Sequence, residues 1–162
     1  MQDPTNTTFL MTKPLLATLS ALLIFAATTG AQEAVPFKGC LYNDEHKIFL
    51  CIDFYSQDVC VPDQDIFGEL PGYLGNFRDS RLWLITSATI TSPTSADIAI
   101  INDYGSEDLE ATLTLKHNDC YELKQGKGSR IKLAIDGKWV KIPSTVTFER
   151  LSKTPDKPTQ QP

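Results

Sequence analysis

The chain lacks the signatures of the common enzyme classes. Neither the G-x-S-x-G turn of serine hydrolases nor the H-E-x-x-H pair of zinc proteases occurs. The only two histidines, His46 and His117, are both expected beside hairpin turns. We therefore expect a protein that is not an enzyme and that holds no cofactor and no metal.

The chain also lacks a run of basic residues. Its formal net charge is −5 at pH 7, and removing an N-terminal segment with Asp3 and Lys13 leaves that value unchanged. Nucleic acids and anionic membrane surfaces are bound mainly through Lys and Arg. We therefore expect no nucleic-acid partner.

One long hydrophobic run is present, at residues 15–27, and it follows Lys13. Small residues precede Gln32, so the order is charge, short hydrophobic segment and small-residue exit, which is typical of a cleaved signal peptide. Thirteen helical residues rise about 20 Å, too little to span a hydrocarbon core of about 30 Å. We predict a signal peptide at 1–31, with Met11 as the true start and cleavage near Ala31. The mature protein is then extracytoplasmic, either periplasmic or secreted, with no membrane span.

The remaining residues are expected to form one domain and a tail. Residues 32–151 have the length of a single domain with one core. Residues 152–162 contain three prolines and no hydrophobic side chain, so burial cannot offset the entropy of ordering them. We predict that this tail is disordered.

The four cysteines fall in the predicted mature region, which favours disulfides over the closely spaced pairs of a zinc site. A tight turn at 55–56 would set Cys51 opposite Cys60, which leaves Cys40 for Cys120. The alternative is Cys40 with Cys51, because the first hairpin also brings their strands together. We prefer Cys51–Cys60, since its connection is shorter and permits less slippage of register.

No segment keeps a 3.6-residue hydrophobic period for more than two turns, whereas alternation with a period of two recurs after residue 36. Strands are expected at 37–42, 47–54, 59–61, 81–91, 96–102, 109–116, 121–125, 130–135, 138–142 and 146–150. A meander of this length tends to close, because closure removes exposed edges. We predict an all-β fold, a small antiparallel meander barrel of lipocalin-like architecture without kinship, with a two-sheet β-sandwich as the alternative.

The strongest hairpin signal is Asp136-Gly137. With that turn fixed, Trp139 points outward, away from the core and between Lys132 and Lys141. The opposite, inner face should bury four hydrophobic residues: Ile131, Leu133, Val140 and Ile142.

Residues 62–78 form the longest irregular segment and carry Phe67, Tyr73 and Phe77. These aromatic side chains are expected either to plug an open end of the barrel or to form a lid or recognition surface. Trp139 is a second candidate for contact with a ligand or partner, since Trp is enriched in binding hot spots.

Three other candidate sites, a catalytic serine–lysine pair, a catalytic carboxylate pair and calcium loops, do not fit the patterns that such sites require. Ser129 and Lys132 match S-x-x-K, but residues three apart on a strand point to opposite faces. Asp53 and Asp58 lie across a hairpin, where carboxylates are mostly solvated. Two acidic loops contain oxygen ligands for calcium, without the spacing of a known calcium loop: Asp63 and Asp65 in one, and Asp103, Glu107 and Asp108 in the other.

These observations favour a non-enzymatic, exported binding module that contacts an unidentified small molecule or extracytoplasmic protein through residues 62–78. A protein inhibitor or immunity-type protein acting outside the cytoplasm is the first alternative. An enzyme of unrecognised type is the second.

Overall fold

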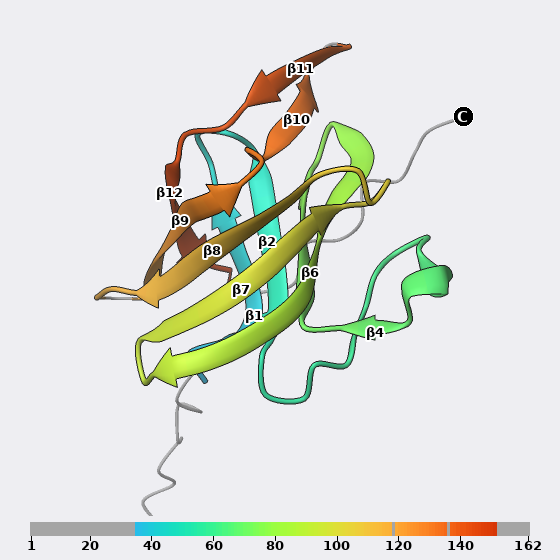
Figure 1. The fold of residues 1–162 in the computed structure, drawn as a ribbon. Helices are drawn as coiled ribbons and strands as arrows, with labels where there is room; N and C mark the ends of the chain where they lie inside the picture. The colour runs from blue at the N-terminus through green and yellow to red at the C-terminus, as the bar shows by residue number, and fades with distance from the viewer. Residues whose placement is uncertain (1–34, 118, 136, 152–162) are drawn as a thin grey trace, which may run out of the picture. The chain divides into compact units, whose positions relative to one another are not determined.

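The computed structural model describes residues 35–117, 119–135 and 137–151 (Figure 1). The predicted signal peptide at 1–31, the predicted tail at 152–162 and Asp136 of the predicted hairpin turn lie outside these residues. Within the described ranges, no helix has the length and hydrophobicity needed to cross a membrane.

Eight antiparallel strands close into a barrel in the order β1-β12-β9-β8-β7-β6-β5-β2, which confirms the predicted barrel. The order follows the chain, with two small insertions. The barrel strands are β1 (Lys38–Asn43), β2 (Ile48–Asp53), β5 (Gly72–Asn76), β6 (Asp79–Ser92), β7 (Ser95–Asn102), β8 (Asp108–Leu115), β9 (Cys120–Gly128) and β12 (Thr145–Arg150). The insertions pair β3 (Val59–Cys60) with β4 (Glu69–Leu70), flanking the 3₁₀ helix η1 (Asp65–Phe67), and β10 (Lys132–Ile135) with β11 (Lys138–Lys141).

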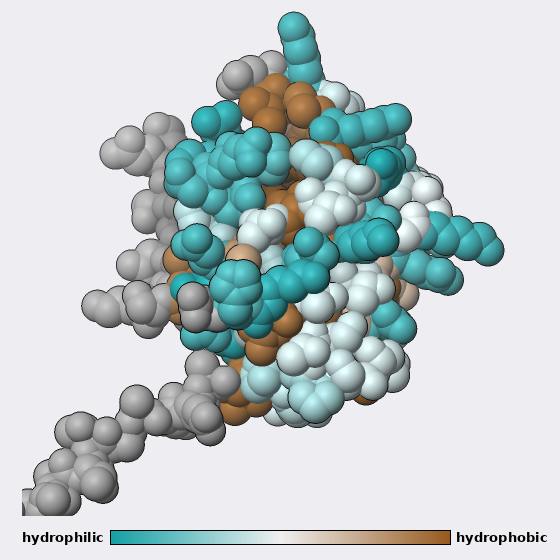
Figure 2. Space-filling model, turned by 90° about the vertical axis from the view of Figure 1, so that its left-hand side faces the viewer, coloured by the Kyte–Doolittle hydropathy of each residue, from teal (hydrophilic) through white to brown (hydrophobic). Residues whose placement is uncertain are grey.

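Alternating hydrophobic side chains fill the barrel. On β7, for example, Ala96, Ile98 and Ile100 point inward and are buried. At one end, the Phe37 ring stacks on Phe54 with centroids 5.8 Å apart. On the side where β9 and β12 lie, the outer surface is mostly hydrophilic or neutral, with small hydrophobic areas (Figure 2). The fold therefore separates a packed interior from a largely polar outer face on that side.

The structure contradicts the predicted disulfide pairing. Cys40 bonds to Cys51, not to Cys120, and Cys60 and Cys120 are free thiols. Cys40 and Cys51 lie directly opposite each other on β1 and β2, with their Cα atoms 4.1 Å apart. The pairing through the first hairpin is the one that forms.

The first turn explains how this register is fixed. The side-chain oxygen of Asn43 accepts a hydrogen bond from the N–H of His46 at 2.7 Å. Lys47 then takes a left-handed backbone conformation, with φ of 55°. The turn so closed places Ile48 opposite Asn43, and counting along both strands brings the two cysteines together.

The second turn explains why Cys60 does not reach Cys51. The Asp53 carboxylate accepts the N–H groups of Tyr55 and Ser56, both at 3.0 Å. This Asx-type turn directs the chain away from β2 instead of folding it back as a hairpin. Cys60 consequently pairs with Glu69 of β4.

Non-reducing peptide mapping is expected to recover a Cys40–Cys51 peptide. The bridge closes a separation of 11 residues, which in the chain-entropy model stabilises the fold by about 3 kcal/mol. Replacing both cysteines by Ala should lower the free energy of unfolding by about that amount in urea. Cys60→Ser is the matched control and should leave it unchanged, while recovery of a Cys51–Cys60 peptide would contradict the assignment.

The β10–β11 hairpin has the predicted register, with Leu133 opposite Val140 and the Ile142 N–H donating to the Ile131 carbonyl at 3.1 Å. Three of the four predicted core residues are buried, but Val140 is 44% exposed, so that part of the prediction is wrong. The reason is that the hairpin forms its own two-stranded sheet outside the barrel wall. Its β10 strand contacts β6, and every residue of β11 is exposed.

Candidate functional site

The predicted aromatic residues of segment 62–78 lie on the outer wall of the barrel, not over an open end. Tyr73 belongs to β5, and Phe67 ends η1. Both pack against a small buried cluster of Val61, Leu82 and Leu84, which is separate from the barrel core. The insertion between β2 and β5 is thus fastened to the wall by its own side chains.

A row of aromatic rings extends this contact across β1, β2 and β5. The Phe49 ring lies 6.0 Å from Tyr73 and 5.0 Å from Phe77, and Phe77 lies 5.6 Å from Tyr42. Burial raises the pKa of the Tyr73 hydroxyl. A Cβ on Gly75 would lie 2.6 Å from Phe49, so the absence of a side chain there lets the Phe49 ring pack closely. Tyr73 and Phe77 are therefore half-buried, and their rings hold this segment against the barrel wall.

The exposed part of the insertion is η1. Ile66 is 89% exposed, the largest exposure of any large hydrophobic side chain in the described part of the chain. Backbone bonds from Phe67 N–H to the Gln64 carbonyl (3.0 Å) and from Gly68 N–H to the Asp65 carbonyl (3.2 Å) fix the turn that carries it. Figure 1 shows η1 and β4 projecting from the side of the barrel.

The projecting insertion is acidic. Residues 55–71 contain four carboxylates and no Lys or Arg, the carboxylates being Asp58, Asp63, Asp65 and Glu69. All four residues are exposed. Ile66 is thus one hydrophobic side chain on a negatively charged protrusion.

A pocket of about 510 Å³ lies at the β10–β11 end of the barrel. Its walls come from the start of β6, the loop between β7 and β8, and the β10–β11 hairpin. Two exposed aromatic side chains line it: Trp139, which is 55% exposed, and Tyr104, which is 72% exposed. Trp139 was predicted as a contact residue, and the structure places it here, away from the other three predicted contacts.

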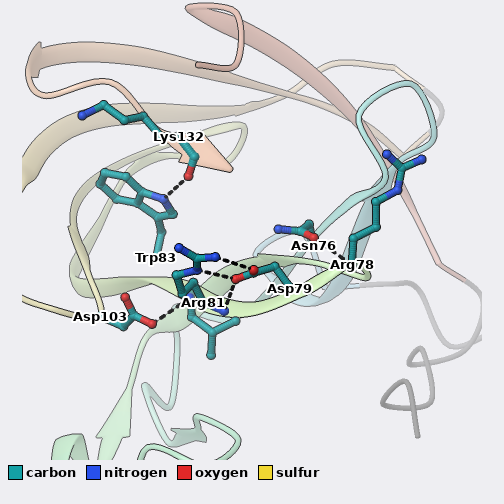
Figure 3. A network of polar contacts seen from close by, with 8 residues as sticks. Asn76, Arg78, Asp79, Arg81, Trp83, Asp103 and Lys132 are labelled. Carbon is teal, nitrogen blue, oxygen red and sulfur yellow. Dashed lines mark hydrogen bonds and ion pairs between the residues drawn. The ribbon is translucent and has the colours of Figure 1, made fainter. Parts of the chain in front are cut away.

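Arg81 is the central cation of the pocket. Its Nε and Nη2 atoms each donate to a carboxylate oxygen of Asp79 at 2.7 Å (Figure 3). This pair holds the pKa of Asp79 below its usual value. The guanidinium carbon also lies 4.5 Å from the centre of the Trp139 ring, a cation–π contact between β6 and β11. Arg81 thereby fixes the position of an indole that remains exposed.

Hydrogen bonds tie the other pocket walls together. The Trp83 indole N–H donates to the Lys132 carbonyl at 2.9 Å, and the Lys132 ammonium pairs with Glu107 (Figure 3 shows the first contact). Asp103 accepts the Leu82 N–H through its side chain at 3.1 Å and donates its own N–H to the Leu82 carbonyl at 3.0 Å. The pocket is therefore held in shape before any ligand arrives.

The remaining candidates have structural partners. Asp53 pairs with Lys38 at 2.6 Å in addition to its turn contacts. Its burial alone raises the pKa of the carboxyl, but these hydrogen bonds outweigh that effect and lower it. Lys132 of the S-x-x-K match pairs with Glu107, and the Ser129 N–H donates to a backbone carbonyl.

The two acidic loops, which lack the spacing of a known calcium loop, differ in their surroundings. Asp103 and Glu107 are both engaged in the pocket walls, while the loop with Asp63 and Asp65 belongs to the projecting insertion. Across residues 35–117, 119–135 and 137–151, no three His, Cys, Asp or Glu side chains gather closely enough to hold a metal ion.

Sequence reasoning missed the Arg81–Asp79 pair and Tyr104. Asp79-Ser80-Arg81 matches no motif, and Arg81 and Trp139 come from distant segments that only the hairpin insertion brings together. Comparison of the chain with protein-family models, with curated proteins and with solved structures finds no match.

Proposed function

We propose that this protein is an exported, non-enzymatic binding module that contacts a protein partner through the projecting insertion between β2 and β5. The observation that carries the proposal is Ile66, 89% exposed on a hydrogen-bonded turn that aromatic anchors fasten to the barrel wall. A hydrophobic side chain held in this way loses little conformational freedom on binding. The disulfide supports an extracytoplasmic location.

The chemistry of the insertion indicates what the partner presents. Residues 55–71, which include Ile66, contain four carboxylates and no Lys or Arg. A complementary partner has a hydrophobic pocket for Ile66 with Lys or Arg at its rim, since such complementarity speeds association and excludes wrong partners. The affinity should therefore fall as salt concentration rises.

Replacing Ile66 by Ser is expected to weaken binding at least about tenfold, because the hydrophobic anchor is lost while the turn remains. The partner is first recovered from the extracytoplasmic fraction of the protein's own host on immobilised wild-type protein. Affinities of the purified partner for each variant are then measured by surface plasmon resonance.

The matched control is Tyr104→Ser, which removes an exposed hydrophobic side chain at the pocket instead. It should leave partner affinity unchanged, and both variants should keep the wild-type melting temperature. Equal affinity of Ile66→Ser and wild-type protein for the partner would refute the proposal.

A second candidate is an inhibitor that uses the same insertion. The filled barrel interior and a single hydrophobic side chain at the tip of a projecting turn favour insertion into a cleft on another protein. If the recovered partner is an enzyme, stoichiometric loss of its activity with wild-type protein, but not with Ile66→Ser, would identify this role.

A further inference from the structure

The pocket at the β10–β11 end is a second binding surface, separate from the projecting insertion. None of its lining residues belongs to residues 55–71. It lies outside the packed core, although Trp83 and Leu133 contribute to both. A volume of about 510 Å³ is within the range of pockets that enclose small ligands.

The aromatic residues of the pocket offer a platform for an apolar molecular face. Trp139 is 55% exposed although Arg81 lies 4.5 Å from its ring centre, and Tyr104 is 72% exposed in the facing loop. Aromatic rings bind other flat apolar surfaces, including other rings and the C–H faces of sugars. The platform alone does not discriminate between these two classes.

The charged and polar groups of the pocket favour a neutral ligand that carries hydroxyl groups. Arg81 is held by both oxygens of Asp79, and the Lys132 ammonium is held by Glu107. An anionic ligand would have to displace one of these carboxylates to gain Arg81 or Lys132, and the third cation that lines the pocket is Lys141, on the exposed strand β11. A neutral ligand can instead use the remaining N–H donors and carboxylate oxygens as they stand, because their positions are already fixed.

The geometry points to a neutral saccharide as the ligand of this pocket, and we propose that a sugar ring packs on Trp139. Its C–H face covers the part of the indole that Arg81 leaves exposed, and its hydroxyl groups hydrogen-bond to Arg81 and Asp103. Arg81 keeps the N–H groups of Nη1 and one N–H of Nη2 beyond the two that donate to Asp79, and Asp103 keeps the oxygen that does not accept the Leu82 N–H. Tyr104 contacts the second sugar unit from the loop side.

The test is a titration of the full mature chain with maltotriose, cellotriose and triacetylchitotriose, followed by tryptophan fluorescence and calorimetry. The protein contains two tryptophans, and only Trp139 is exposed while Trp83 is buried. Saccharide binding should shift the emission of Trp139 to shorter wavelength and saturate below about 10 mM for at least one probe. Benzoate and glucuronate serve as anionic comparators and should bind more weakly.

Trp139→Ala and Tyr104→Ala should each weaken saccharide binding at least about tenfold by calorimetry. Tyr55→Ala, which removes an exposed aromatic ring outside the pocket, and Ile66→Ser should leave it unchanged. Because Ile66→Ser separates the two surfaces, failure of this inference and failure of the proposed partner contact are distinguishable.

Three results would overturn the inference. They are no response to any of the three trisaccharides at about 10 mM, tighter binding of benzoate or glucuronate than of every saccharide, and equal saccharide affinity in Trp139→Ala and wild-type protein.

Discussion

Leu133→Ala is expected to lower the free energy of unfolding by about 3–5 kcal/mol. Leu133 is 2% exposed and packs in the main core cluster, although it belongs to the β10–β11 hairpin and not to the barrel wall. Its removal would leave a cavity between the hairpin and the barrel, since the neighbouring Ile131 and Ile142 are themselves tightly buried. Urea unfolding measured by circular dichroism gives the value directly.

Val140→Ala is the matched control, because Val140 lies directly opposite Leu133 in the hairpin but is 44% exposed. It should cost less than about 1 kcal/mol. The pair therefore tests whether β10, and not β11, packs on the core. Equal losses from the two substitutions would contradict the asymmetry between β10 and β11.

The same hairpin shows what the sequence could predict. Asp136-Gly137 predicted the pairing of Leu133 with Val140, because a two-residue turn leaves one register. Period-two alternation likewise predicted the barrel, since each strand needs one buried face. Burial of Val140 was mispredicted because pairing determines which residues face each other, and not whether another part of the fold covers them.

The prediction of the disulfide pairing was wrong for a different physical reason. The two decisive turns depend on side-chain oxygens of Asn43 and Asp53 and on positive φ angles at Lys47 and Gln57. None of these positions carries the glycine that usually indicates such a conformation. Counting residues outward from an assumed turn at 55–56 therefore gave the wrong partner for Cys51.

The candidate site was predicted only in part. Phe67, Tyr73, Phe77 and Trp139 were selected for their chemistry, and the structure divides them between wall anchors and a pocket. Ile66 escaped attention because an isolated Ile in a loop has no pattern. Its exposure depends on how the neighbouring Phe67 turns inward, which is a property of the folded insertion.

Arg150 closes the opposite end of the barrel, where the chain enters β1. Its guanidinium donates to the backbone carbonyls of Val35 (3.1 Å), Pro36 (2.8 Å) and Lys38 (2.5 Å), and it contacts the Tyr121 hydroxyl. These contacts lie on both sides of Phe37, whose side chain is fully buried. One side chain of β12 thus holds the segment that inserts the Phe37 ring.

Arg150→Met is expected to lower the free energy of unfolding by about 4 kcal/mol, because several carbonyls lose a charged donor at once. Arg150→Lys should recover only a small part, since a single ammonium cannot reproduce the planar fork of donors. The N–H of Phe54 bonds to the Phe37 carbonyl at 3.0 Å, so its hydrogen exchange reports locally on the Phe37 segment. That exchange should accelerate in Arg150→Met beyond the increase at β7 amides.

Arg78→Met removes an exposed guanidinium at the other end of the barrel and should change stability by less than about 0.5 kcal/mol. This control separates loss of the carbonyl contacts from loss of one positive charge in an acidic protein. If Arg150→Met stays within 1 kcal/mol (about fivefold in the folding equilibrium) of wild type and Phe54 exchange is unchanged, the Phe37 segment is held without the Arg150 contacts. The stacking of Phe37 on Phe54, with ring centroids 5.8 Å apart, and the backbone hydrogen bond between these two residues would then suffice to close this end of the barrel.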